Sequence, residues 1–169
     1  MKQTTQEQAQ APKPDPELKK LHVWVGHWTA EFELMAGPWG RGGPVTLEYS
    51  GQMILGGFIY QGRWTGKGAL GQMRGLQIDA YDPANKNFVS RWYQDDGNTF
   101  AGVQTVSGNT YTWAGKFVVG GKPYLLKDTF VFAPGLMSAT VKSEVSVDGK
   151  TWAPFTEGKY TKAKPTAKK

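Results

Sequence analysis

The sequence predicts an all-β protein, and three observations support this fold class. Glycine occurs 22 times and aromatic residues reach 13%, whereas only 20% of the residues are charged, which suits strands and turns better than a helical bundle. From residue 28 onwards, apolar and polar residues alternate with a period of two in one segment after another. Short turns rich in Gly, Asn, Asp and Pro separate these segments, which is typical of an antiparallel meander.

One short helix is predicted before the strands. Asp15–Glu17 supplies a capping acid, a proline at the first helical position and an acid in the first turn. Leu18 and Leu21 follow at helical spacing. We therefore expect a helix from about Pro16 to about Trp24, ended by Gly26.

About ten strands are expected after this helix. In the first, one face carries Trp28, Ala30, Phe32 and Leu34, and the other carries Thr29, Glu31 and Glu33. Nine further segments of strand character lie at about 45–56, 58–64, 72–81, 88–94, 99–106, 111–119, 124–132, 137–147 and 152–161. Asp148-Gly149 fits the two-residue turn of a hairpin between the last two.

Ten consecutive strands with no intervening helix most simply close into an antiparallel barrel, with the N-terminal helix closing one end. An eight-stranded barrel holds side chains or one small ligand, so ten strands leave an interior cavity or a flattened barrel. An open two-sheet sandwich is the structural alternative. A chain of 169 residues corresponds to one domain, which we place at residues 15–161. We expect residues 1–14 to be a disordered leader and 162–169 a disordered basic tail.

The orientation of the strand expected at residues 72–81 stays open. Its more apolar face carries Leu76, Ile78 and Ala80, and the opposite face carries Asp79 and Tyr81. If the apolar face points inward, the two polar residues lie on the surface. In a ligand-binding barrel, the mixed face could be the inner one instead.

Charge and composition exclude several function classes. The formal net charge of +6 belongs to the ends of the chain, because Lys+Arg and Asp+Glu balance between residues 21 and 157. We therefore expect no specific nucleic-acid partner, since proteins that bind nucleic acids carry a basic face on the folded body.

No apolar run is long enough to span a membrane as a helix. The polar N-terminus is typical of a chain whose signal peptide has been removed, which favours a secreted or periplasmic protein over a cytoplasmic one.

Little in the sequence points to catalysis, a metal or a cofactor. The absence of cysteine excludes disulfides, zinc-finger sites and thiol chemistry, and only His22 and His27 could serve as histidine ligands or bases. No nucleophile elbow or phosphate-binding loop is present. We expect no cofactor, although an enzyme remains an alternative.

Several motifs resemble those of a known group of barrels. The order of helix, Gly26-His27-Trp28 and alternating strand resembles the opening of calycin barrels, in which lipocalins, fatty-acid-binding proteins and nitrobindins share a Gly-x-Trp motif. With Ile54–Phe58, Ala80–Asp82, Ser90–Tyr93 and Ser146–Trp152, the chain from about 16 to 160 resembles an uncharacterised bacterial domain family with a lipocalin-like barrel. This resemblance implies the fold and permits small-molecule binding.

The resemblance does not extend to haem. Nitrobindin-like barrels take the axial histidine of their haem from the late strands, and this sequence has no histidine after His27.

The candidate site consists of aromatic residues on the faces expected to point inward. The ligand-binding candidates are Phe32, Phe58, Tyr60, Trp64, Trp92 and Trp113. Arg63 and Arg91 each precede a tryptophan; pointing inward they could hold a carboxylate, and on the outer surface their stems would pack against the barrel. Gly26 and Trp28 are structural candidates, with the Trp28 indole filling the barrel floor beneath the helix.

The sequence favours a non-catalytic protein that binds a small apolar or aromatic molecule inside the barrel. One alternative is an enzyme that acts on such a molecule in the same cavity. Another is a solid barrel that works through surface contacts or self-association, as in a homodimer.

Overall fold

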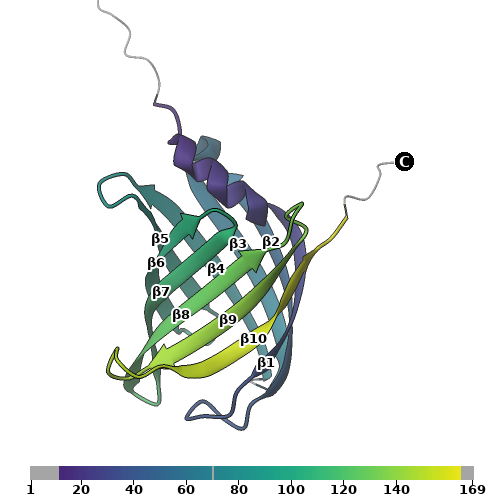
Figure 1. Cartoon of the computed structure of the whole chain (residues 1–169), viewed down its shortest axis with the longest axis vertical. Coiled ribbons are helices and arrows are strands. Elements are labelled where there is room, and N and C mark those ends of the chain that lie inside the picture. Colours follow the sequence, from purple (N-terminus) through teal and green to yellow (C-terminus); the bar gives the residue numbers. More distant parts are fainter. Residues whose placement is uncertain (1–11, 70, 165–169) are drawn as a thin grey trace, which may run out of the picture.

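The computed structural model describes residues 12–69 and 71–164, and the predicted leader and tail lie largely outside this part of the chain. Figure 1 shows the strands forming a barrel, with a short helix across one end. The elements in chain order are η1 (Pro16–Trp24), β1 (Gly26–Leu34), β2 (Gly43–Ile54), η2 (Leu55–Gly57), β3 (Ile59–Gly68), β4 (Gly71–Asp82), β5 (Asn87–Gln94), β6 (Thr99–Ser107), β7 (Thr110–Val119), β8 (Lys122–Phe132), β9 (Ser138–Ser146) and β10 (Ala153–Lys162).

The ten strands form a closed antiparallel barrel in sequence order, which confirms the predicted fold class over the open sandwich. Each strand pairs with its neighbours in the chain, and closure comes from β1, which pairs with both β2 and β10. Trp28 faces Lys162 across this seam, and Leu34 faces Thr156. Because the first and last strands pair, neither leaves a free edge that could recruit another strand.

Local signals in the sequence explain η1. The Asp15 side chain accepts a hydrogen bond from the Glu17 backbone N–H at 2.9 Å, as an N-cap should. The helix has the 3-10 geometry rather than the α geometry, and it buries Leu18 and Leu21. The Tyr111 hydroxyl donates a hydrogen bond to the Lys20 carbonyl at 2.8 Å, which ties the helix to β7. Among the described residues, no helix is long and apolar enough to cross a membrane.

The end of the barrel beneath η1 is filled with aromatic side chains. Trp24, the last residue of η1, places its ring 5.5 Å from Trp28 and 4.8 Å from Phe132, measured between centroids. Trp28 is 1% exposed and lies under the helix. Gly26, just before it, has a φ of 110°, which glycine adopts far more easily than other residues. We call this packed region the closed end.

The C-terminal boundary of the barrel lies beyond the predicted residue 161. Lys162 is the last residue of β10, and the Ala163 backbone N–H donates to the His27 carbonyl at 2.8 Å. The Lys162 ammonium donates to the Val23 carbonyl at 3.0 Å and lies 5.2 Å from the Trp28 ring centroid. Lys162 thus links β10 to η1, although its charge suggested a residue of the tail.

Glycines inside the strands make room for large aromatic residues on the same strand or on a neighbouring one. A Cβ atom on Gly75 would lie 2.4 Å from the Trp64 ring, and one on Gly115 would lie 2.4 Å from the Trp113 ring. At the closed end, a Cβ on Gly51 would lie 2.1 Å from the Tyr60 hydroxyl. The high glycine content therefore serves interior packing as well as the turns.

Candidate ligand-binding cavity

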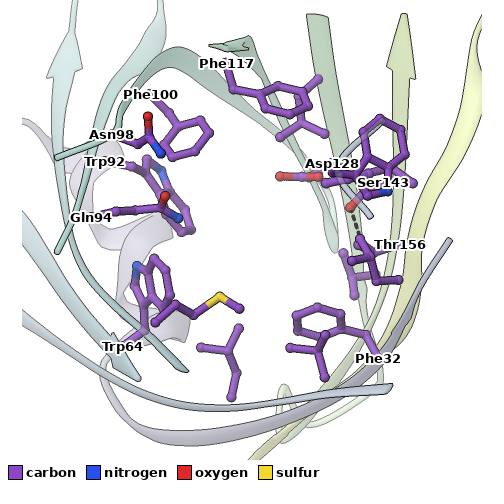
Figure 2. A pocket seen from close by; sticks show the side chains of 18 of the residues that line it. Phe32, Trp64, Trp92, Gln94, Asn98, Phe100, Phe117, Asp128, Ser143 and Thr156 are labelled. Atoms are coloured by element: carbon purple, nitrogen blue, oxygen red, sulfur yellow. Dashed lines mark hydrogen bonds between the residues drawn. The ribbon is translucent and has the colours of Figure 1, made fainter. Parts of the chain in front are cut away.

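A cavity of about 430 Å³ occupies the half of the barrel away from η1. The strand ends at Leu34, Val45, Gln94 and Val119 surround it, together with the loops between them. Its walls are mainly aromatic, with side chains of Phe32, Trp39, Trp64, Trp92, Phe100, Trp113, Phe117, Phe130, Phe155 and Tyr160. Figure 2 shows the labelled side chains arranged around this space. We call this region the open half.

Three tryptophans from alternate strands form one wall of the cavity. Trp64 on β3, Trp92 on β5 and Trp113 on β7 follow one another, with 6.3 Å between successive ring centroids. They point inward because each lies on the buried side of a period-two pattern. Gly75 on β4 and Gly102 on β6, the strands between them, leave space for the Trp64 and Trp113 indoles, and the wall therefore depends on both residue types.

The mouth of the cavity has an aromatic side and a polar side. In the loop between β1 and β2, the Trp39 indole N–H donates to the Met35 carbonyl at 2.6 Å, and its ring lies 4.7 Å from that of Phe155. The turn between β5 and β6 contributes Asp95 and Asp96 to the opposite side. The mouth is thus partly covered by Trp39, whereas η1 lies across the closed end.

Asp128 provides a carboxyl group on the cavity wall. It lies on β8 opposite Trp113 on β7 and Ser143 on β9, and Figure 2 shows its carboxyl group pointing into the cavity. Burial raises the pKa of Asp128 to about 6, although a hydrogen bond from Ser143 lowers it. Thr156 on β10 in turn donates to the Ser143 hydroxyl at 2.7 Å. The carboxyl group therefore has polar neighbours on one side and the cavity on the other.

The charges around the cavity are of one sign. Asp95, Asp96 and Asp128 line it, and no Lys, Arg or His of the described chain does. Asp95 is paired with Arg74 at 3.0 Å, outside the cavity, which holds its pKa below the usual value. Asp128 takes part in none of the ion pairs found in residues 12–69 and 71–164.

A second acid, Asp79, lies on the inner face of β4 and is 1% exposed. The orientation left open by the sequence is therefore the one with the mixed face inside. Asp79 accepts hydrogen bonds from Gln77 at 2.7 Å and from Ser90 at 2.6 Å. Burial raises the pKa of Asp79 to about 7, whereas these two hydrogen bonds lower it.

Asp79 belongs to a chain of hydrogen bonds between the closed end and the cavity wall. The Tyr49 hydroxyl donates to Gln77 at 2.9 Å and lies 2.7 Å from the Tyr60 hydroxyl. At the other end, the Trp92 indole N–H donates to the Ser90 hydroxyl at 3.0 Å. Burial raises the pKa of both tyrosines well above the ordinary value, so both stay neutral.

The structure brings four of the predicted ligand-binding residues to the cavity. Phe32, Trp64, Trp92 and Trp113 line it. Tyr60 does point inward, but it is fully buried at the closed end, against Tyr49.

The other three predicted residues lie away from the cavity. Phe58 follows η2 and is 36% exposed, because the chain turns there before β3 begins. Arg63 and Arg91 are exposed on the outer face of the barrel. Neighbouring residues of a strand point to opposite faces, so an arginine beside an inward tryptophan must point outward. The expectation that these arginines could hold a carboxylate inside the barrel is therefore wrong.

Several cavity residues were missed by sequence reasoning, and Asp128 is the most important of them. It alternates with Leu126 and Phe130, which also line the cavity, so a charged residue on an apolar face was the available signal. Trp39 was missed because it lies in a Gly/Pro loop rather than in a strand. Within the described residues, no three His, Asp or Glu side chains come together as metal ligands would.

Comparison with known proteins identifies a family and a structural neighbour. The crystal structure of Rv2717c from M. tuberculosis has 10% sequence identity and a TM-score of 0.63, and the match covers 90% of this chain and 100% of that one. At this identity, the similarity establishes a shared fold. No curated protein matches the sequence. Residues 13–162 match the family described as "Protein of unknown function (DUF1579)". The chain therefore belongs to the DUF1579 family.

Proposed function

We propose that this protein binds a small apolar or aromatic molecule in the open half of its barrel. The observation that carries the proposal is the cavity of about 430 Å³ with its aromatic walls. Cavities that hold small molecules in proteins measure roughly 300–1,000 Å³ and are lined mostly by apolar and aromatic side chains with a few polar groups. The barrel then acts as a lipocalin-like container, with η1 as its floor.

The packing of the two ends supports this proposal. A barrel of ten strands is too wide for one layer of side chains to fill, and within the described residues the helix η1 fills the closed end alone. Phe32 and Trp92 remain half-buried, although they point inward. Covering this apolar surface with a ligand releases water from it and favours binding by about 25 cal/mol per Å².

An uncharged fluorophore whose emission rises in apolar surroundings tests the proposal. We expect it to bind with a stoichiometry of about one and to quench tryptophan emission, because Trp64, Trp92 and Trp113 face the cavity. Titrations should be followed both by probe emission and by tryptophan emission.

Two matched substitutions on β8 locate the binding site. Leu126 lines the cavity, whereas Val131 lies on the outer face and is 41% exposed. Leu126→Trp fills the cavity and should weaken probe binding at least about tenfold, since the ring occupies the space that the probe needs. Val131→Trp adds the same ring outside and should change the affinity by less than about twofold. Equal effects of the two variants would place the probe on the outer surface and contradict the proposal.

A further inference from the structure

We propose that the ligand of the cavity is an organic cation, with an ammonium group beside Asp128 and an apolar or aromatic body against the tryptophan wall. This inference rests on the proposed function and narrows it to one chemical class. It replaces the possibility of a ligand carboxylate inside the barrel, which depended on Arg63 and Arg91 pointing inward.

The first argument is the lack of a cationic partner for Asp128. Its carboxyl group points into the cavity, and its neighbours Trp113, Ser143 and Tyr160 carry no positive charge. Lys127, next to it in the chain, pairs with Glu144 on the outer face. An ionised carboxylate in apolar surroundings is costly unless it is paired. A cation that enters the cavity would supply the pair that the protein lacks.

The second argument is the set of aromatic rings near Asp128. Trp113 lies opposite it on β7, and Phe130 lies two residues further along the same face of β8. Tyr160 is close enough that the charge of Asp128 raises its pKa. Aromatic faces attract ammonium groups, and several such rings together commonly bind quaternary ammonium ions.

The third argument is the sign of the remaining charges around the cavity. Asp96 at the mouth carries the same sign as Asp128, Asp95 is already paired with Arg74 outside the cavity, and the described cavity wall holds no basic side chain. An opening that is lined by negatively charged side chains and has low-dielectric walls attracts cations and repels anions. Both the mouth and the wall therefore favour a positively charged ligand.

The test compares two probes that differ in one atom. Naphthylmethyl-trimethylammonium carries a fixed positive charge, and its carbon isostere has the same shape without the charge. Naphthylacetate supplies the corresponding anion. For the unaltered protein we expect the cation to bind at least about tenfold more tightly than the isostere, and the anion to bind more weakly than both. Competition against the uncharged fluorophore gives all three affinities.

Two matched variants assign the preference to Asp128. Asp128→Asn keeps the shape of the side chain and removes its charge, so the ratio of cation to isostere affinity should fall close to one. Glu144→Gln removes the same charge from the outer face of β9, where it pairs with Lys127, and should leave the ratio unchanged. Asp128→Ser provides a second neutral variant if the amide substitution prevents folding.

The pH dependence gives an independent measurement, because the charge of a trimethylammonium group is fixed. Asp128 is faced by Trp113 on β7, Ser143 on β9, and Thr156 and Tyr160 on β10. Of these only Tyr160 is titratable, and burial raises its pKa further. Asp95 and Asp96 lie at the mouth. Binding of the cation should weaken as Asp128 is protonated below a pH of about 6, and Asp128→Asn should abolish this dependence.

The outcomes separate the two proposals. If neither the fluorophore nor any of the three naphthyl compounds binds, both the proposed function and this inference are wrong. If the uncharged compounds bind but the cation has no advantage, the cavity is a ligand site and the inference alone fails. A preference for the cation that survives Asp128→Asn also overturns the inference.

Discussion

The closed end and the open half of the barrel contain similar aromatic side chains but pack them differently. At the closed end, Trp24 enters from η1 and touches Trp28 and Phe132, and the interior is filled. In the open half, Trp64 and Trp92 come from the strands alone, and about 430 Å³ stays empty. The difference shows that the strands of a ten-stranded barrel do not fill its interior by themselves. A segment from outside the sheet must do so.

The two acids on the inner face of the barrel, Asp79 and Asp128, differ in a similar way: Asp79 is buried, whereas Asp128 is only half-buried. Asp79 accepts hydrogen bonds from Gln77 and Ser90 and is shielded from the cavity within a connected network. Asp128 has Ser143 as its hydrogen-bonding neighbour and otherwise faces open space. The protein therefore satisfies the carboxyl group of Asp79 internally and leaves that of Asp128 available to a ligand.

The largest expected effect comes from removing one tryptophan at each end. Trp28→Ala should lower the free energy of unfolding by roughly 3–5 kcal/mol, as large aromatic truncations in packed cores do. Trp92→Ala should cost about 1–2 kcal/mol, since the Trp92 side chain is only half-buried and borders an existing cavity. Urea denaturation measures both values. Equal losses would mean that the open half is packed as tightly as the closed end.

The next effect is a pH dependence of stability that originates in Asp79. Burial raises its pKa from 3.8 to about 7, so the folded state holds this proton at pH values where the unfolded state has released it. Stability should therefore fall as the pH rises from about 4 to about 7, by at most about 4 kcal/mol, and then level off. Asp128, with a pKa raised to about 6, contributes with the same sign at the lower part of this window.

Denaturation midpoints measured at half-unit steps of pH test this dependence. Asp79→Asn should flatten the decline between pH of about 6 and about 7, where Asp128 is already largely ionised. Asp128→Asn is the matched control and should reduce the decline in stability only at pH values below about 6. An unaltered protein that becomes more stable as the pH rises through 6 and 7 would contradict the assignment.

Most of the fold could be predicted from the sequence, because it follows from local patterns. Period-two alternation predicted the strands, the cap at Asp15 predicted the helix, and short turns between all strands predicted a meander that closes. The inward positions of Trp64, Trp92 and Trp113 follow from the same alternation. That alternation also excludes Arg63 from the interior, since Trp64 beside it points inward.

The site could be predicted only in part, because it depends on contacts between distant segments. The inner face of β4 carries Gln77 and Asp79, which can be buried because Tyr49 and Ser90 on other strands bond to them. Local hydrophobicity favoured the opposite face. Whether Tyr60 fills the core or lines the cavity depends on η1, which no strand pattern reveals.

A smaller effect is expected from adding one methyl group at glycines of the two regions. A Cβ on Gly51 would meet the Tyr60 hydroxyl at 2.1 Å and the Trp24 carbonyl at 2.4 Å, and neither atom has space to retreat in the packed end. For a Cβ on Gly75, the three nearest atoms all belong to the Trp64 indole, which borders the cavity and can shift into it. We expect Gly51→Ala to cost about 1–3 kcal/mol and Gly75→Ala less than about 1 kcal/mol.

In ligand binding, the order of the two variants should be reversed: Gly75→Ala should have the larger effect and Gly51→Ala the smaller one. Gly75→Ala moves the Trp64 ring into the space proposed for the ligand and should weaken binding of the uncharged fluorophore, whereas Gly51→Ala should leave it unchanged in the folded protein. Thermal unfolding and probe titration on the same samples separate the two effects. A Gly75→Ala protein that is as destabilised as Gly51→Ala would contradict the freedom of movement attributed to Trp64.

The smallest effect on stability is expected at Trp39, which covers part of the mouth as η1 covers the floor. Its ring is half-buried and is held by a hydrogen bond to the Met35 carbonyl and by the edge of Phe155. Trp39→Ala removes these contacts and the one with the Tyr124 ring, whose centroid is 6.1 Å away, and should lower the free energy of unfolding by less than about 1 kcal/mol. Because the mouth becomes wider, the uncharged fluorophore should both enter and leave faster in stopped-flow measurements. Phe155→Leu, which removes the partner ring but keeps an apolar side chain at the mouth, should have the same effect to a smaller degree. If exchange of the fluorophore is unchanged in both variants, the ligand enters the open half by another route, and Trp39 has no role comparable to that of η1.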